Sequence, residues 1–226
     1  MQETTSAIAP LCEANVPRVA QLLAAAFSDD PAYRYLFPDT QLGQLALSDF
    51  FARNLRAHLR LGCSYTLLSE HAATLATVTL RPPGGLHMSL PELVVRGLAP
   101  FAFAHGLAAT RRLGWLKRTY DRLEIEAARG GEHHYVHMMA VRPELRGRAL
   151  GSALLGEVLA RTMPRTQCVL TTHFERNLLF YRRFGFEVCG ETRLHPPGAT
   201  PYTVWSMVRP AVVRPRDSTE PACVPL

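Results

Sequence analysis

Apolar residues recur along the chain at two different periods and predict alternating helices and strands. A short apolar run near residues 6–11 predicts a strand, and apolar positions at helical spacing over residues 19–27 predict a helix after it. Residues 28–31 are predicted to end that helix. A second helix is predicted over residues 41–61, and Gly62 is expected to end it.

The middle of the chain predicts a hairpin followed by a helical insertion. Residues 64–69 and 72–80 are rich in Val, Leu and Thr, which favours two strands joined by a turn. Helical periodicity returns over residues 89–129, where Ser89 and Glu92 have the spacing of a capping box. Two or three short helices are expected rather than one rod, because three residues interrupt the pattern: Pro100, Gly106 and Gly114.

In the second half of the chain, strand and helix patterns alternate. Alternation at this spacing predicts βαβ units and an α/β sheet. Prolines without periodicity follow from residue 210, which indicates a flexible C-terminal tail. The predicted strands cover residues 133–141, 167–172, 186–194 and 202–209, and the predicted helices cover residues 150–161 and 175–184.

Composition narrows the class of protein. The chain has 226 residues, of which 47% are hydrophobic, and this suits one packed domain with insertions. Its five cysteines are odd in number and form no CxxC pair, so neither a disulfide scaffold nor a structural zinc site is expected. Residues 1–10 lack targeting character, and the longest apolar stretch, residues 98–110, is too short to cross a membrane. We expect a cytoplasmic protein without a membrane partner.

The formal net charge of +6 does not indicate a nucleic-acid partner. All of the 25 basic residues except Lys117 are arginine, which is typical of a GC-rich coding sequence, and acidic residues are interleaved with them. Because a nucleic-acid surface requires clustered charge rather than net charge, no nucleic-acid partner is expected.

The strongest chemical signal lies where the strand over residues 133–141 ends. A proline and a short loop with Arg146, Gly147 and Gly151 lead directly into an amphipathic helix. Small residues let a ligand approach the backbone, and the first amides of a helix have no partner within it, so they attract phosphate. The loop predicts a pyrophosphate cradle or an ordinary strand–helix connection, and this segment alone does not decide between the two.

A second motif follows in the next strand–helix unit. Asn177 and Tyr181 are four residues apart and share one helical face, and Gly185 and Phe186 come after them. In this order and separation, the loop over residues 146–151 and the second motif resemble the signature of the GNAT superfamily of acetyl-CoA-dependent N-acetyltransferases.

The resemblance is strong over about residues 135–191. It is weaker at residues 16–31, where the chain is similar to bacterial members that resemble puromycin N-acetyltransferase. The resemblance implies an α/β fold with a GNAT-like mixed, mostly antiparallel twisted sheet of about six to seven strands flanked by helices. It also implies one domain over residues 1–210 with a helical insertion at about 86–130, followed by a tail over residues 211–226.

The resemblance also implies roles for the matched residues. Acetyl-CoA is the expected donor co-substrate, Tyr181 is expected to protonate the departing thiolate, and Asn177 is expected to contact the cofactor arm. Splayed backbone at the end of the fourth strand is expected to bind the arm and polarise the thioester carbonyl. The predicted cofactor-binding residues are Met139, Ala140, Val141, Arg146, Gly147, Arg148, Ala149, Leu150, Gly151, Ser152, Asn177 and Tyr181.

Two positions depart from the family's pattern. Ala149 replaces the middle glycine of the loop, and we expect it to keep a helical φ, which alanine adopts freely. Thr171 stands where many relatives have a glutamate, so another residue or a water molecule must act as the general base. His137 is the predicted base, with a packed sheet histidine as the alternative, and His173 is a further candidate. Glu175 is expected to cap its helix instead.

No metal cofactor is expected, although three histidines lie close together in the sequence. His133 and His137 share one face of a strand about 13 Å apart, at about 3.3 Å per residue, which is too far for one zinc ion. His134 projects from the opposite face.

The acceptor pocket is predicted to involve the segment after the first helix. Phe27, Asp29, Asp30 and Tyr33 form an aromatic and acidic cluster that can attract a cationic amine and give it a flat wall. A helix cap with a packed loop is the alternative interpretation of the same residues.

Three functional hypotheses follow. The first is transfer of an acetyl group from acetyl-CoA to the primary amine of a small molecule, by direct attack in a ternary complex. The second is acetylation of a peptide or protein N-terminus, or use of another acyl-CoA donor. The third is a non-catalytic CoA-binding sensor or interaction module, which Ala149 and Thr171 favour and Asn177 and Tyr181 oppose. The sequence leaves open whether the chain is a monomer or a homodimer.

Overall fold

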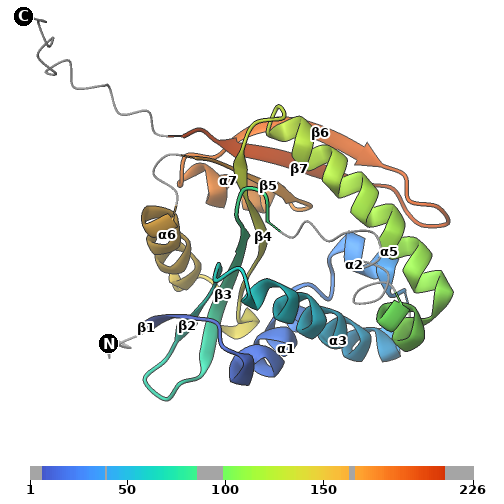
Figure 1. Ribbon diagram of the computed structural model, residues 1–226, viewed down its shortest axis with the longest axis horizontal. Coiled ribbons are helices and arrows are strands. Elements are labelled where there is room, and N and C mark those ends of the chain that lie inside the picture. The colour runs from blue at the N-terminus through green and yellow to red at the C-terminus, as the bar shows by residue number, and fades with distance from the viewer. Residues whose placement is uncertain (1–6, 39, 86–98, 163–165, 212–226) are drawn as a thin grey trace, which may run out of the picture.

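A seven-stranded sheet in the order β1-β2-β3-β4-β5-β7-β6 runs through the molecule (Figure 1). The computed structural model describes residues 7–38, 40–85, 99–162 and 166–211. Neighbouring strands are antiparallel except for β4 and β5, which confirms the predicted mixed, mostly antiparallel sheet. All seven predicted strands are present: β1 (Ala7–Pro10), β2 (Ser64–Leu68), β3 (Thr74–Arg81), β4 (His133–Val141), β5 (Gln167–Thr172), β6 (Glu187–Leu194) and β7 (Tyr202–Arg209).

The alternation of strands and helices produces one parallel βαβ unit in the described parts of the chain. β4 is followed by the short 3-10 helix η3 (Pro143–Leu145) and by α6 (Leu150–Thr162), which leads to β5, its parallel neighbour. β5 is followed by α7 (Arg176–Arg182), but β6 then lies at the sheet edge, and β7 pairs antiparallel with both. The prediction of repeated βαβ units is therefore wrong for the last two strands, because they form a hairpin.

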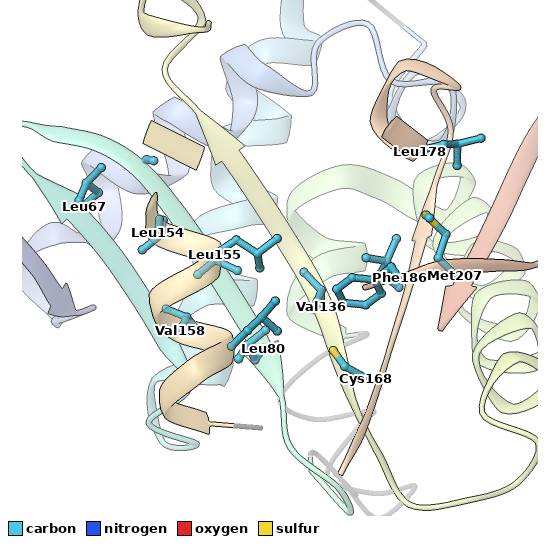
Figure 2. Close-up of a cluster of buried hydrophobic side chains, with 14 of the residues drawn as sticks. Leu67, Leu80, Val136, Leu154, Leu155, Val158, Cys168, Leu178, Phe186 and Met207 are labelled. Atoms are coloured by element: carbon cyan, nitrogen blue, oxygen red, sulfur yellow. The ribbon is translucent and has the colours of Figure 1, made fainter. Parts of the chain in front are cut away.

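Helices cover both faces of the sheet. On one face, α6 and α7 pack over β2 to β5 and β7, and Figure 2 shows Leu154, Leu155 and Val158 of α6 in this core. On the other face, α1 (Val16–Ala26), which follows the 3-10 helix η1 (Glu13–Asn15), and α3 (Thr40–Leu59) pack against Met138 and Ala140 of β4. The apolar residues that predicted these helices are the buried ones, because helical spacing places them on one side.

The first helix ends at residues 27–30 as predicted, and a short helix that the sequence did not predict follows it. α2 (Pro31–Leu36) begins at Asp30, whose Oδ1 accepts a hydrogen bond of 3.0 Å from the backbone N–H of Ala32. Pro31 occupies the first turn, where the missing N–H costs nothing. Asp30 and Pro31, which the sequence assigned to the end of the first helix, are thus also the start of α2.

The described part of the predicted helical insertion consists of two helical segments joined at a kink, so the predicted interruption at Gly106 is confirmed. α5 (Ala99–Ala127) bends at Gly106, whose φ of 79° and ψ of 168° are non-helical. Gly114 is helical, so the predicted interruption there is wrong, whereas the residues before Pro100 lie outside the described residues and its interruption stays a prediction. Ser89 and Glu92 lie outside the described residues, as does most of the predicted tail. In the described parts of the chain, no helix has the length and apolar character needed to cross a membrane.

Replacement of two glycines of α5 by alanine should change the free energy of unfolding in opposite directions. Gly106→Ala should lower the free energy of unfolding by about 1–3 kcal/mol, because only glycine adopts that backbone region without strain. Gly114→Ala should raise it by about 0.5–1 kcal/mol, because the position is helical and its added methyl meets nothing closer than 3.7 Å. Chemical denaturation of the two variants measures both effects, and equal responses would contradict the single kink.

Candidate active site

The two parallel strands at the centre of the sheet separate after three residue pairs. His133, His134 and Tyr135 of β4 pair with residues 167–169 of β5, and β4 then continues to Val141 beside β3 alone. Backbone N–H and C=O groups on the open side of β4 therefore need other partners. This is the splayed backbone that the resemblance predicted at the end of the fourth strand.

β4 also contains a bulge at His137. Val136 and Met138 pair with the adjacent residues Leu80 and Thr79, so His137 is the additional residue on this strand. A bulge turns the following side chains to the other face. Val136 accordingly belongs to the core under α6, whereas Met138 belongs to the core under α1 and α3.

A cavity of about 1070 Å³ adjoins this region, lined by side chains from both halves of the chain. Asp29 is exposed and is not among the lining residues, so the structure does not bring it to the other predicted residues. The loop over residues 146–152 is also outside the lining. Seven of the predicted site residues line the cavity: Phe27, Asp30, Tyr33, His137, Met139, Asn177 and Tyr181.

The loop before α6 has two left-handed residues. Gly147 has a φ of 81°, and Ala149 has a φ of 58°, so the prediction of a helical φ for Ala149 is wrong. This conformation costs an alanine roughly 1–2 kcal/mol. The Ala149 carbonyl accepts the first helical hydrogen bond, 3.0 Å from Ala153 N, and left-handed residues in a loop before a helix are typical of backbone anion sites. The loop geometry therefore suits an anion.

Gly151 lets the start of α6 approach the end of β4. A Cβ atom at this position would lie 3.0 Å from Val141 Cγ2 and 3.3 Å from Met139 Cε. Arg146 fixes the loop from the other side, with its guanidinium 3.4 Å from the carbonyl oxygen of Ala26. The unpaired first amides of α6 and the open backbone of β4 are thus side by side, which fits a diphosphate joined to an extended arm.

Asn177 and Tyr181 lie on α7 beside the parted strands. Asn177 Nδ2 donates a hydrogen bond of 2.8 Å to Thr172 Oγ1 at the end of β5. Tyr181 packs edge-on against Phe186, with the ring centroids 5.8 Å apart. Burial, and to a smaller extent the neighbouring Tyr135 and Cys168, raise the pKa of Tyr181. The Tyr181 hydroxyl therefore keeps its proton at neutral pH, as a general acid must.

His137 lies against a second histidine. Its ring stacks on His58 of α3, with centroids 4.7 Å apart, and its Nε2 is 3.1 Å from Asn54 Oδ1. Burial lowers the pKa of His137 well below its ordinary value, and the neighbouring His58, Arg81 and Lys117 lower it further. His137 is therefore neutral at pH 7, and its protonated form is disfavoured.

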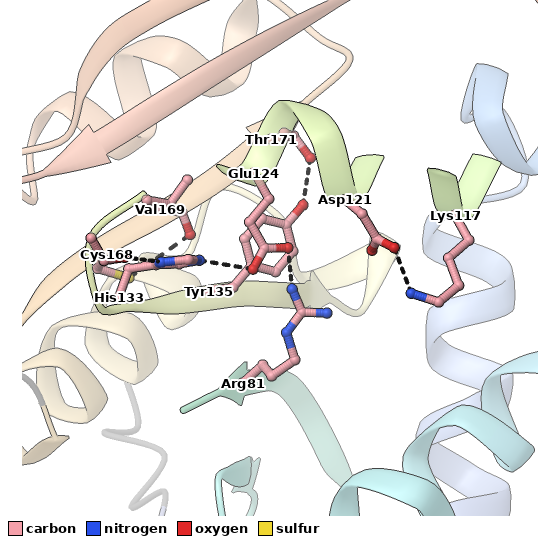
Figure 3. Close-up of polar contacts among 10 residues, drawn as sticks. Arg81, Lys117, Asp121, Glu124, His133, Tyr135, Cys168, Val169 and Thr171 are labelled. Carbon is pink, nitrogen blue, oxygen red and sulfur yellow. Dashed lines mark hydrogen bonds and ion pairs between the residues drawn. The ribbon is translucent and has the colours of Figure 1, made fainter. Parts of the chain in front are cut away.

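The wall of the cavity next to α5 is charged but internally paired (Figure 3). Glu124 contacts both Arg81 and His133, the latter at 2.9 Å. Thr171, which replaces the family's glutamate, shares a hydrogen bond of 2.7 Å with the Tyr135 hydroxyl. His133 and His137 thus have different partners, and no cluster of three or more potential metal ligands occurs among the residues described.

The structure joins residues that the sequence did not connect. Asp30 Oδ2 is 2.6 Å from His173 Nδ1, and His173 Nε2 is 2.5 Å from the Tyr120 hydroxyl, which lies 3.2 Å from the Tyr202 hydroxyl. The sequence placed Asp30 with the acceptor and His173 among the possible bases. No sequence signal pairs them, because 143 positions separate them.

Residues 114–188 match the family model described as the acetyltransferase (GNAT) domain. Solved GNAT acetyltransferases share the architecture over nearly the whole chain. A Corynebacterium glutamicum structure, described as histone acetyltransferase HPA2 and related acetyltransferase, has a TM-score of 0.64 at 18% identity and covers 93% of this chain and 98% of its own. The fold is the GNAT fold.

Two further structures extend the comparison. Drosophila melanogaster polyamine N-acetyltransferase has a TM-score of 0.59 at 16% identity and covers 90% of this chain and 99% of its own. Sinorhizobium meliloti phosphinothricin acetyltransferase, in complex with AcCoA, has a TM-score of 0.57 at 14% identity. It covers 97% of this chain and 98% of its own. No curated protein matches the sequence. The matched domain and the GNAT fold indicate an acyltransferase, while the similarity to puromycin N-acetyltransferase stays a prediction.

The stacked histidines should make the fold sensitive to acid. Burial lowers the pKa of His58 and, more strongly, that of His137 below 6.5. The unfolded chain therefore takes up protons below pH 6.5 that the folded chain excludes, so the free energy of unfolding falls as the pH drops. The loss is about 1.4 kcal/mol per pH unit for each histidine that stays neutral.

Denaturation at pH 7.5 and pH 5.5 measures this effect in the wild type and in a variant with both His58→Gln and His137→Gln. We expect the wild type to lose more stability between the two pH values, since the other ionisable groups are common to both proteins. Equal losses of stability in the two proteins would contradict the role of these two histidines in acid sensitivity.

Proposed function

We propose that this chain transfers an acetyl group from acetyl-CoA to the primary amine of a small molecule, by direct attack in a ternary complex. The observation that carries the proposal is the meeting of three features at the parted strands: the anion-binding loop, the open backbone of β4, and a cavity that contains Tyr181. A cytoplasmic location and the choice between monomer and homodimer stay predictions.

The donor side uses the end of β4 and the start of α6. Backbone amides from Gly147 to Ser152 would hold the diphosphate, and Arg146 and Arg148 add positive charge beside it. Residues 139–141 would hydrogen-bond the extended arm, and Asn177 would contact it from α7. Acetyl-CoA supplies an activated thioester there, and the open backbone of β4 can polarise its carbonyl.

The acceptor side is the cavity. Its volume of about 1070 Å³ is at the upper end for a small-molecule pocket, which leaves room for an amine beside the end of the donor. Phe27 and Tyr33 stack edge-on at 5.4 Å and give it an aromatic wall. The polyamine and phosphinothricin acetyltransferases with this fold support a small amine as the acceptor.

Tyr181 is the proposed general acid, which gives its proton to the departing thiolate. Two imidazoles line the cavity and are the candidates to take up the proton of the amine, His137 and His173. The surroundings of His137 weaken its basicity, so we assign it to the wall that contacts the acceptor, together with Asn54 and His58. Positioning of the amine against the thioester supplies most of the expected acceleration.

The donor assignment predicts different effects for two glycines of α6. Gly151→Ala should weaken CoA binding about tenfold, the effect of about 1.4 kcal/mol, because the new methyl pushes the start of α6 away from Val141. Gly156→Ala is the matched control, since its methyl meets Phe184 at an ordinary 3.5 Å. Calorimetric titration with CoA measures both variants, and unchanged affinity in Gly151→Ala would argue against this placement of the diphosphate.

Thiol release from acetyl-CoA, measured against a panel of small amines and N-terminal peptides, tests the function itself. We expect turnover with at least one small primary amine and a fall in kcat of about 10²-fold in Tyr181→Phe, with CoA affinity unchanged. Turnover with peptides only would favour N-terminal acetylation. CoA binding without turnover on any acceptor would favour a sensor and contradict the proposal.

A further inference from the structure

A chain of short hydrogen bonds links four elements along one wall of the cavity. It runs from Asp30 at the start of α2 to His173 after β5, to Tyr120 of α5 and to Tyr202 of β7. The first two distances are 2.6 Å and 2.5 Å, which are short even for hydrogen bonds to charged groups. Asp30, His173 and Tyr120 all line the cavity.

When His173 is neutral, the state in which it can act as a base, its partners fix the direction of every proton in the chain. The carboxylate of Asp30 only accepts, so His173 Nδ1 carries a proton and donates it to Oδ2. His173 Nε2 then has a lone pair and accepts from the Tyr120 hydroxyl. Because Tyr120 has one proton, Tyr202 must be the donor in their contact of 3.2 Å. The Tyr120 oxygen keeps room for one further donor.

Asp30 is held rigidly for this task. Its side chain is 4% exposed, and its second oxygen, Oδ1, accepts from the backbone N–H of Ala32. One carboxylate therefore caps α2 and orients the His173 ring. Among the described residues, the titratable groups in contact with His173 are Asp30, Tyr120 and Tyr202, and the last two pack edge-on against its ring at 5.7 Å and 5.5 Å.

We propose that Asp30, His173 and Tyr120 form the relay that removes the proton from the attacking amine. The amine nitrogen gives a proton to the Tyr120 oxygen, and the phenolic proton of Tyr120 moves to His173 Nε2. Tyr120 ends neutral, His173 ends as an imidazolium, and the Asp30 carboxylate stabilises that charge. The arrangement follows the logic of a Ser-His-Asp triad, with a tyrosine in the place of the serine.

The surroundings of Tyr120 and His173 agree with transfer of a proton from one to the other. Burial, together with Tyr202, Asp30 and Tyr135, raises the pKa of Tyr120 well above its ordinary value. Tyr120 therefore keeps its own proton at rest and passes protons on rather than forming a stable phenolate. His173 differs from His137 in having a carboxylate partner, whereas His137 is surrounded by His58, Arg81 and Lys117.

The inference rests on the proposed acetyl transfer, and Asp30→Asn is its sharpest test. The amide oxygen still accepts from Ala32 N and caps α2, but the amide NH₂ now faces His173 Nδ1 and favours the other tautomer. His173 Nε2 can then no longer accept from Tyr120. We expect kcat to fall at least about 10²-fold while CoA affinity and the melting temperature stay close to those of the wild type.

His173→Gln and Tyr120→Phe break the same relay at its other members. We expect similar falls in kcat, and a pH profile of kcat that loses the acidic limb of the wild type and rises with hydroxide, because solvent must take the proton. His133→Gln is the matched control, since His133 also forms an imidazole–carboxylate contact in this region, with Glu124 at 2.9 Å, and does not line the cavity.

The outcomes separate the relay from the acetyl transfer. Asp30→Asn and His173→Gln enzymes with kcat within about threefold of the wild type and an unchanged pH profile would overturn the relay alone. An equal fall in His133→Gln would also overturn it, because the effect would then not be specific to the relay. A wild-type chain that binds CoA and acetylates no amine would overturn both proposals. If His173→Gln does not fold, Asp30→Asn decides, because it keeps the helix cap.

Discussion

The separation of β4 from β5 after Tyr135 is the constraint on which the site depends. A parallel pair that continued would satisfy its own backbone and leave no gap in the sheet. Because the pairing stops, the outer half of β4 offers free N–H and C=O groups, and the cavity adjoins them. The bulge at His137 turns the side chains that follow it on β4 to the other face of the sheet. Gly151 lets the start of α6 approach the end of β4. The proposed donor and acceptor sites therefore both adjoin one interruption of a hydrogen-bond ladder.

Four carboxylates around this gap are paired with basic side chains of the protein. Asp30 contacts His173, Asp49 contacts Arg53, Asp121 contacts Lys117 and Glu124 contacts Arg81. Each of these four carboxylates therefore already has a basic partner. Asp30 lines the cavity but also caps α2 and contacts an imidazole, and its predicted role as an attractor of cations stays a prediction. Asp29, which is exposed, takes no part in the cavity.

Local patterns in the sequence are sufficient to predict most of the helices and strands and to find two motifs. They do not predict which distant residues come into contact in the site. Period-2 and helical patterns predicted all seven strands and the helices α1, α3, α6 and α7, because burial of one face imposes them. They missed α2, whose proline and Asp30 also suit a turn, and they could not order β6 and β7. The Asp30–His173–Tyr120 chain was invisible, because its members come from distant segments and meet only in the tertiary fold.

Ala149 shows how a local rule can fail where a site requires it. The sequence suggested that alanine would avoid the backbone of the glycine it replaces, and this departure favoured a sensor without catalysis. The structure instead gives Ala149 the left-handed φ of 58°, at a cost of roughly 1–2 kcal/mol that the surrounding elements must offset. Ala149 thus adopts the left-handed region that glycine favours. The departure at Ala149 therefore no longer argues against the donor site that the proposed function requires.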